Sequence, residues 1–197
     1  MGYSQEDKAT SRAKIVAAAA HRIRESGLTG FSIADVMKDA NLTHGGFYGH
    51  FESRDELVAA ALDQALRRSE LVYDSDAQLT LKQIVTQYLS RAHRDTPPDG
   101  CAVVALGSEI ARSEGETREV MNTHLKKYFQ KISALLGDNH ALAIPIVCMM
   151  NGALTLSRLL DDKAVSDKVL KEARDCILAM AADKTPALHK PARQARN

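Results

Sequence analysis

The sequence contains no tryptophan, and aromatic side chains make up only 5% of its 197 residues. Glycine and proline, with 11 and 5 residues, are sparse outside a few short stretches, whereas alanine is abundant. A chain with few turn residues and few aromatics favours helices over strands. Because 45% of the residues are hydrophobic, the chain can bury a sizeable core, and this excludes an intrinsically disordered protein.

Cysteine is also scarce, and Cys101, Cys148 and Cys176 lie far apart. An odd number of cysteines without a Cys-x-x-Cys pair signals neither a disulfide framework nor a zinc site, so we expect no metal and no other cofactor. The N-terminus lacks the apolar core of a signal peptide. The longest apolar run, residues 141–150, is interrupted by Pro145 and falls short of the roughly 20 residues that span a membrane. We therefore expect a protein of the reducing cytoplasm with no membrane partner.

The chain has no excess of basic residues, because its formal net charge is +1. Its first 51 residues contain six Lys and Arg against five Asp and Glu. A basic patch, the usual sign of a nucleic-acid-binding surface, is thus missing from the composition. Any contact with DNA must come from the local placement of charge and from neutral hydrogen-bond donors.

Residues 32–51 nevertheless contain two short helical patterns joined by a tight turn. Ser32 is a favoured N-cap residue, and Asp35 follows at the spacing of a capping box. Val36 and Met37 belong to the apolar face of this first helix. Asn41 tolerates a positive φ, so it can end the helix and turn the chain.

The second pattern, residues 44–50, contains three glycines, which lower helix stability. Thr43 is placed to cap this segment. Phe47 and Phe51 are spaced to anchor it on its inner side, and Tyr48 then faces outward. A segment with so little intrinsic stability depends on tertiary packing, and its glycines allow the backbone to approach a large partner closely. Together the two patterns predict a helix-turn-helix.

Helical patterns fill the rest of the chain as well. They cover about residues 9–26, 54–72, 81–95, 101–111, 116–136 and 140–160, and a last helix follows residue 166. A second capping box, from Ser53 to Glu56, opens the helix that links the two parts of the chain. Residues 140–160 are apolar on nearly every face, which indicates burial against a second subunit. The sequence predicts an all-α fold of about nine helices, the first three of them forming an N-terminal helix-turn-helix domain.

The order of residues from Gly27 onward is specific. It runs through Gly27, Phe31-Ser32-Ile33-Ala34, Val36, Ala40, Leu42-Thr43, Gly45, Phe47-Tyr48, His50-Phe51, Ser53-Arg54 and Glu56-Leu57. Over roughly residues 10–58 the chain resembles the TetR family of bacterial transcriptional regulators. Two positions depart from the family pattern: Asn41 replaces the usual glycine of the turn, and Arg54 replaces the more common lysine.

The resemblance implies a DNA-binding domain over residues 1–52 and a helical ligand-binding and dimerisation domain over residues 53–183. We expect a basic, disordered tail over residues 184–197. Family members form homodimers through their last two long helices, and most repress transcription until a small molecule releases them from DNA. We therefore expect a dimeric repressor, and not an enzyme, bound to a double-stranded palindromic operator with half-sites ~34 Å apart.

The resemblance also assigns residues to the DNA surface. They are Ser32, Thr43, His44, Gly45, Gly46, Tyr48, His50 and Arg54. Tyr48 and His50 would bind phosphates, and Thr43 and His44 could reach base edges. Ser32 is equally explained by helix capping alone, and the alternative for Arg54 is an ordinary surface position. A solvated polar turn, with glycines for flexibility, is the alternative for the whole set.

An effector pocket is expected among the C-terminal helices. Its candidate lining residues are Tyr88, Leu106, Leu125, Tyr128, Phe129, Met150 and Leu154. These side chains are apolar or aromatic, so we expect a hydrophobic or aromatic effector. Each of them is also explained as a core residue.

Cys101 carries an alternative mechanism, because a thiol at a helix N-terminus can become reactive and act as an electrophile or redox sensor. The alternative is a small buried hydrophobe, and for Cys148 and Cys176 we expect plain core or dimer packing. Catalysis is disfavoured. His44 and His50 do not share one helix face for a metal, and no carboxylate is arranged to orient a His93–Cys101 pair.

Overall fold

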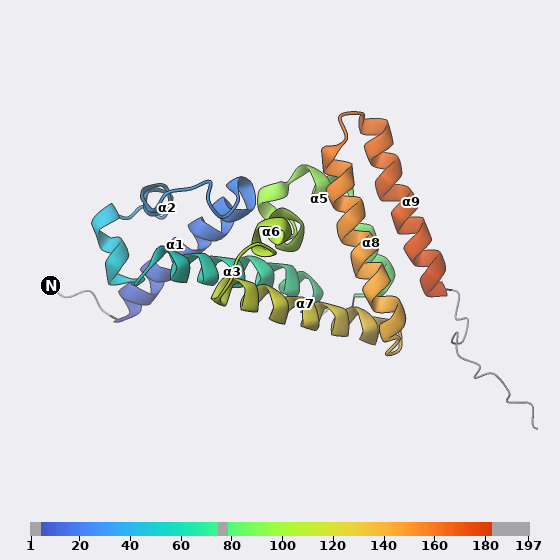
Figure 1. The fold of residues 1–197 in the computed structure, drawn as a ribbon, viewed down its shortest axis with the longest axis horizontal. Helices are drawn as coiled ribbons and strands as arrows, with labels where there is room; N and C mark the ends of the chain where they lie inside the picture. The colour runs from blue at the N-terminus through green and yellow to red at the C-terminus, as the bar shows by residue number, and fades with distance from the viewer. Residues whose placement is uncertain (1–4, 75–78, 183–197) are drawn as a thin grey trace, which may run out of the picture.

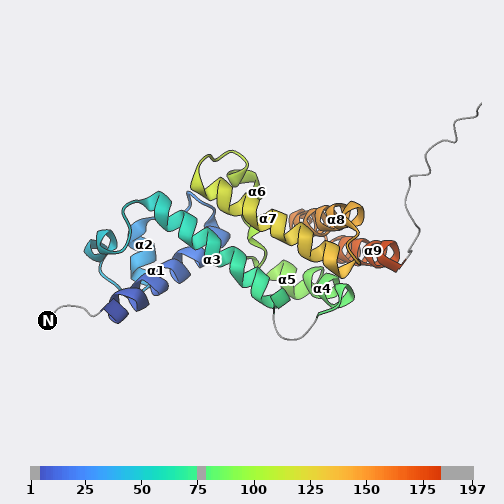
Figure 2. The same cartoon turned by 90° about the horizontal axis from the view of Figure 1, so that it is seen from below.

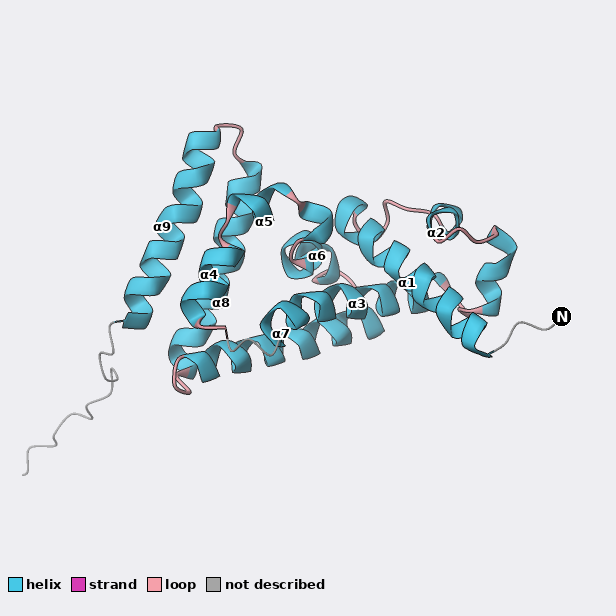
Figure 3. Ribbon diagram, turned by 180° about the vertical axis from the view of Figure 1, so that it is seen from behind, coloured by secondary structure: helices cyan, strands magenta, loops and turns pink. Residues whose placement is uncertain are grey.

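The computed structural model describes residues 5–74 and 79–182, and within these ranges all regular structure is helical (Figures 1 and 3). The predicted tail over residues 184–197 lies outside the described residues. The α-helices are α1 (Gln5–Ser26), α2 (Ile33–Asp39), α3 (Arg54–Asp74), α4 (Leu81–Tyr88), α5 (Arg91–Asp95), α6 (Ala102–Ile110), α7 (Glu116–Leu135), α8 (His140–Leu159) and α9 (Lys163–Ala182). Two 3-10 helices, η1 (His44–Gly49) and η2 (Pro97–Asp99), complete the order. The predicted all-α class is confirmed.

Several helix limits differ from the prediction. α1 begins four residues earlier, at Gln5, and α9 begins at Lys163 and not after residue 166. The helix predicted over residues 81–95 is two helices, because Leu89 leaves the helical conformation (φ −92°, ψ 50°) and Ser90 caps a new start by accepting a hydrogen bond from the His93 N–H. Residues 44–49 form a 3-10 helix and not an α-helix, which suits a glycine-rich segment fixed by tertiary packing.

A first hydrophobic cluster fills the N-terminal half. α1, α2, η1 and the first half of α3 contribute most of it, with Ile15, Ile23, Phe47, Leu57 and Leu62 fully buried at its centre. The cluster does not stop at the predicted boundary after residue 52, because Leu106 and Ile110 of α6 and Met121 of α7 belong to it. Figure 2 shows α3 and α7 running side by side through the middle of the molecule. The DNA-binding half therefore shares its core with the helices that follow.

A second cluster lies among α4, the C-terminal half of α7, α8 and α9. α8 and α9 pack as an antiparallel pair at the end of the molecule opposite the start of α1 (Figure 1). By length and composition alone α8 could cross a membrane, but it packs in the second cluster against α7 and α9. Its outer face carries large apolar side chains, among them Leu159 at 73% exposure.

Candidate nucleic-acid interface

The first helix of the motif begins at a complete capping box. Ser32 Oγ accepts a hydrogen bond from the Asp35 N–H (3.1 Å), and the Asp35 carboxylate accepts from the Ser32 N–H (3.1 Å). The Ser32 hydroxyl also donates to Asp35 Oδ2 at 2.6 Å. These bonds from Ser32 lower the pKa of Asp35, which stays ionised. The predicted cap at Ser32 is confirmed, and the hydroxyl is occupied by it.

The turn that follows has the predicted geometry. Asn41 adopts φ +57°, the left-handed conformation that this residue type tolerates. Its N–H donates to Lys38 O (3.0 Å), and the Leu42 N–H donates to Met37 O (2.9 Å). The replacement of the usual glycine by Asn41 therefore leaves the turn intact.

η1 presents two distinct sides. Phe47 and Phe51 are buried and stack with ring centroids 5.6 Å apart. Tyr48, between them, is 72% exposed and meets Phe47 edge-on. The predicted split into an inner phenylalanine pair and an outer tyrosine is confirmed, and it explains how a 3-10 segment with little intrinsic stability keeps its place.

The remaining outward residues differ among themselves. Thr43 and His44 are exposed. The prediction that Thr43 caps the segment is wrong, because its side chain makes no capping hydrogen bond. His50 is only half-buried, and its Nδ1 has no hydrogen-bond partner among the described residues. Thr43, His44 and Tyr48 thus carry the exposed side chains of residues 43–50.

No steric clash within the protomer requires glycine at the three glycine positions of η1. A Cβ added at Gly45 or at Gly49 would meet no atom within 4 Å. At Gly46 the nearest atoms are 3.7 Å away, an ordinary contact. The structure gives none of the three a positive φ. The fold of one protomer therefore does not explain why these three residues are glycines.

Arg54 is turned toward the protein. Its Nη2 donates to the carbonyl oxygens of Leu28 (2.5 Å) and Phe31 (3.4 Å), and its guanidinium lies 4.6 Å from the centre of the Phe31 ring. These contacts tie the start of α3 to the loop between α1 and α2. Neither reading of Arg54 anticipated this position, which requires knowing that the loop folds back onto α3.

The second predicted capping box is only half formed. The Glu56 N–H donates to Ser53 Oγ (3.1 Å), as expected. The Glu56 carboxylate, however, accepts from the Glu52 N–H (2.7 Å) and from Arg12 (3.2 Å) instead of the Ser53 N–H. The bond from Glu52, followed by that from Arg12, lowers the pKa of Glu56. Arg12 also lies over the Phe51 ring at 4.6 Å, so α1 and the start of α3 are joined beside η1.

This arrangement of α1, α2, η1 and the start of α3 agrees with the sequence comparison. Residues 15–61 match the profile described as bacterial regulatory proteins, tetR family. By its N-terminal domain the chain belongs to the TetR family. It is a DNA-binding transcriptional regulator of the helix-turn-helix type. TetR-family regulators bind operator DNA, act as dimers and are not enzymes.

Longer matches extend the similarity beyond the TetR-type domain. An HTH-type transcriptional regulator encoded in the lacX 3′ region of Lactococcus lactis is 25% identical over 167 residues, which are 77% of this chain and 85% of the relative. The crystal structure of a TetR regulator from Chloroflexus aurantiacus superposes with a TM-score of 0.77 at 23% identity and covers 91% of this chain and 98% of its own. The reduced form of Escherichia coli NemR gives 0.69 at 17% identity, with 85% and 94% covered. These two structures show the fold alone.

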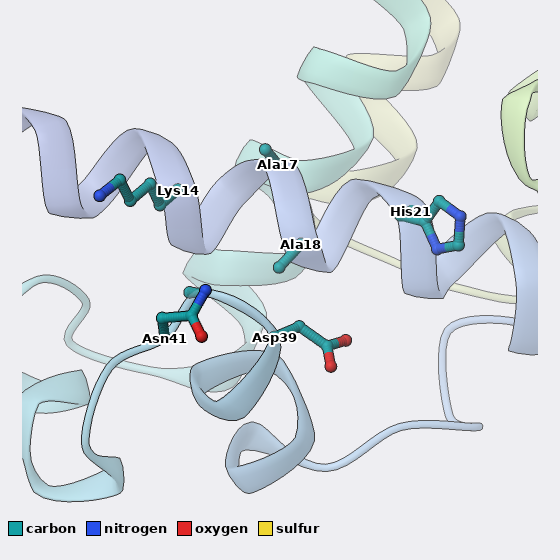
Figure 4. Close-up of a pocket in the computed structure, with 7 residues that line it drawn as sticks. Lys14, Ala17, Ala18, His21, Asp39 and Asn41 are labelled. Carbon is teal, nitrogen blue, oxygen red and sulfur yellow. The ribbon is translucent and has the colours of Figure 1, made fainter.

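The TetR-type domain has a surface groove of about 440 Å³ that the sequence did not predict (Figure 4). Its lining residues are Lys14, Ala17, Ala18, His21, Asp39, Ala40 and Asn41. The small alanines of α1 and of the turn open it, and an ion pair beside it joins Arg22 to Asp39 (2.6 and 3.1 Å). This pairing lowers the pKa of Asp39. The only signal in the sequence is the pair of adjacent alanines on the polar side of α1.

The predicted effector-lining residues divide between the two clusters. Leu106 and Leu125 pack in the first cluster. Tyr88, Tyr128, Phe129, Met150 and Leu154 pack in the second. The two tyrosines have polar contacts in this cluster. Tyr88 Oη donates to Asn151 Oδ1 (3.1 Å), and Tyr128 Oη lies 4.0 Å from Met150 Sδ. The structure therefore brings five of the seven together, as packed core side chains.

Cys101 is buried at the N-cap position of α6, and its Sγ lies 3.9 Å from Asn151 Oδ1. Its backbone N–H donates to His93 Nε2 (3.0 Å), and His93 Nδ1 donates to Tyr88 O (2.8 Å). Both bonds require the neutral imidazole with its proton on Nδ1. Burial lowers the pKa of His93, and the charge of Arg158 lowers it further. His93 and Cys101 thus meet through the backbone and not as an imidazole–thiol pair.

Proposed function

We propose that this TetR-family regulator is a cytoplasmic, dimeric repressor that leaves a palindromic operator when a hydrophobic or aromatic effector binds its C-terminal helices. The assignment of η1 to the operator-binding surface rests on the open space around this segment. Gly45 and Gly49 have room for a side chain in the free protomer, and Tyr48 is exposed beside them. A large partner that packs against this backbone accounts for both features.

The proposed contacts follow from exposure. Tyr48 donates a hydrogen bond to a phosphate, as does the half-buried His50, and Thr43 and His44 reach base edges. Gly45 and Gly46 let the sugar–phosphate chain approach. Ser32 contributes mainly as a cap, because its hydroxyl already bonds to Asp35. The internal bonds of Arg54 weigh against a phosphate contact there and favour a role in fixing α3.

The proposed dimer uses the outer faces of α8 and α9. The exposed residues of α8 that repeat every three or four positions, here named the α8 stripe, are Ala141, Ile144, Pro145, Cys148, Gly152, Leu156 and Leu159. An apolar stripe of this length on one helix matches a helix–helix interface, and Gly152 permits close approach. A two-fold dimer formed through this face would present one η1 segment per subunit. The two segments would bind two operator half-sites ~34 Å apart.

The operator surface is tested by selecting bound fragments of the source genome with the full-length protein, followed by gel-shift titration of wild type and Tyr48→Ala. Wild type is expected to select a palindrome, and Tyr48→Ala to bind it at least about tenfold more weakly, since a charge-assisted hydrogen bond is worth about 1.5–3 kcal/mol. Because Tyr48 is exposed, the thermal midpoint should stay unchanged. Equal operator affinity in the two proteins would contradict the proposed surface.

A second mode of release is thiol sensing through Cys101. It is favoured by the position of this thiol at the N-cap of α6 and by the Arg158 guanidinium, which lies beside the preceding residue, Gly100. NemR, similar in fold, was solved in a reduced form. An electrophile such as N-ethylmaleimide would then release wild type from DNA and leave Cys101→Ser bound. Release of both proteins, or of neither, would reject thiol sensing through Cys101.

A further inference from the structure

α6 reaches both hydrophobic clusters and is tied to the chain at each end. Cys101, at its start, belongs to the second cluster, whereas Leu106 and Ile110 belong to the first. At the start the Cys101 N–H donates to His93 Nε2 (3.0 Å). Near the end Glu109 Oε2 accepts from the backbone N–H of Leu28 (2.8 Å). The nine residues of this helix thus bridge the two clusters, and each of its ends is bonded to a different part of the chain.

Leu28 lies in the loop that leads to the N-cap of α2. α1 ends at Ser26, and the next residue, Gly27, has φ +78° and donates its N–H to Ile23 O (3.0 Å). This single bond is the αL type of helix ending, which leaves the next N–H free of the helix. The Leu28 N–H bonds to Glu109 instead, while the Leu28 carbonyl accepts from Arg54 (2.5 Å). One residue of the loop is thus bonded to α6 on one side and to α3 on the other.

The approach of α6 to this loop is close. A Cβ at Gly27 would lie 2.6 Å from Glu109 Oε1, so a side chain there would displace the Glu109 carboxylate, and the positive φ also favours glycine. The position of Glu109 is also unfavourable for α6 itself, because a carboxylate in the last turn of a helix faces the negative end of the helix dipole. Glu109 is the penultimate residue of Ala102–Ile110. Its bond to the Leu28 N–H supplies a reason for a carboxylate at this place.

We propose that Glu109 is a positioning residue for the DNA-binding surface: through the Leu28 N–H it sets the orientation of the loop before α2, and α6 carries changes in the C-terminal helices to that loop. This inference rests on the proposed operator binding and names the contact that regulates it. Without the bond, the loop before α2 loses its tie to α6, and α2 and η1 change orientation more freely. In a dimer that binds two half-sites, this freedom lowers affinity and weakens the discrimination of half-site spacing.

The test compares full-length wild type with Glu109→Ala, Glu109→Gln and Glu109→Asp. Binding is measured to the selected operator and to versions with one base pair added or removed between the half-sites. Glu109→Ala is expected to bind the operator about five- to tenfold more weakly and to show a smaller penalty for altered spacing. Glu109→Gln retains an acceptor of the same reach and should behave as wild type. Glu109→Asp keeps the charge but is too short, so it should behave as the alanine variant.

Glu119→Ala, which removes an exposed carboxylate from α7, is the matched control and should change nothing. The spacing penalty separates positioning from a loss of stability, since partial unfolding reduces binding to all operator versions alike. Wild type that selects no DNA would overturn the proposed function and this inference with it. Wild type that binds, with Glu109→Ala and Glu109→Asp keeping its affinity and spacing penalty, would overturn the inference alone.

Discussion

The guanidinium of Arg94 lies 2.7 Å from the carboxylate of Asp167 and joins α5 to the first turns of α9. Arg94 is buried, and it also bonds to Ser166 Oγ (2.8 Å) and to both oxygens of Asp95 (2.8 and 3.0 Å). Ser166 in turn donates to Ser157 O in α8 (2.6 Å). The bond from Arg94 lowers the pKa of Asp167, which therefore remains ionised. One arginine thus fixes α5 to the junction of the two helices proposed to form the dimer.

We expect Arg94→Met to lower the free energy of unfolding by about 2–3 kcal/mol, because the buried Ser166 hydroxyl loses a charged donor while the apolar stem is kept. Arg91→Met is the matched control, since Arg91 binds the same Asp167 at 2.6 Å with a side chain that is 73% exposed. An exposed ion pair stabilises little, so its loss should be much smaller. Urea unfolding followed by circular dichroism, at equal protein concentration, measures both. An equal loss of unfolding free energy in the two variants would contradict the view that the buried arginine stabilises the fold more than the exposed one.

Stability should fall as the pH drops below about 6.5 because of His93. Burial and then the charge of Arg158 lower its pKa in the folded protein, whereas an unfolded chain has the ordinary value of 6.5. The unfolded state therefore binds the proton first as the pH falls, and the folded state loses stability in that window. In His93→Gln the free energy of unfolding should be lower than in wild type at pH 7, and it should change less between pH 7 and pH 5. His140→Gln, altered at an exposed position, should keep the wild-type slope; a wild-type slope in His93→Gln would contradict this role.

Local capping chemistry made part of the fold predictable. Ser32 with Asp35 specifies a helix start, and Asn41 specifies a turn, through bonds within a few residues, and the structure has both as expected. The inner placement of Phe47 and Phe51 followed from helical spacing, which a 3-10 segment of this length preserves well enough.

Contacts between distant residues could not be predicted. The break between α4 and α5 interrupts a continuous helical pattern and depends on His93, which bonds to both Tyr88 and Cys101. Glu109 and Leu28 are 81 residues apart, and no spacing rule joins them. The position of Arg54 at a helix start suggested a surface cation. Its contact with the Phe31 ring could not be predicted, because Phe31 lies in a loop whose path is set by the whole core.

The α8 stripe leads to a prediction about assembly. Leu156 is 56% exposed in the protomer and lies within the stripe. Leu156→Lys places a charge in the proposed interface, where burying it is costly, so the variant should sediment as a monomer with an unchanged helical circular-dichroism spectrum. Thr123→Lys, at an exposed position of α7, is the control and should remain a dimer. A dimeric Leu156→Lys protein would place the subunit contact elsewhere.

Gly45→Ala separates folding from DNA binding within η1. A Cβ there meets nothing in the protomer, and replacing glycine reduces the freedom of the unfolded chain, so the free energy of unfolding should stay equal or rise by up to about 1 kcal/mol. The same methyl group would stand in the proposed path of the DNA backbone, and operator affinity should fall at least about tenfold, on the order of 1.4 kcal/mol. Gly107→Ala is the matched control, because a Cβ at Gly107 in α6 also meets no atom within 4 Å and this residue lies outside the motif. Thermal melting and gel-shift titration on each variant give the two quantities. If Gly45→Ala bound the operator as tightly as Gly107→Ala, close approach of DNA to η1 would be rejected.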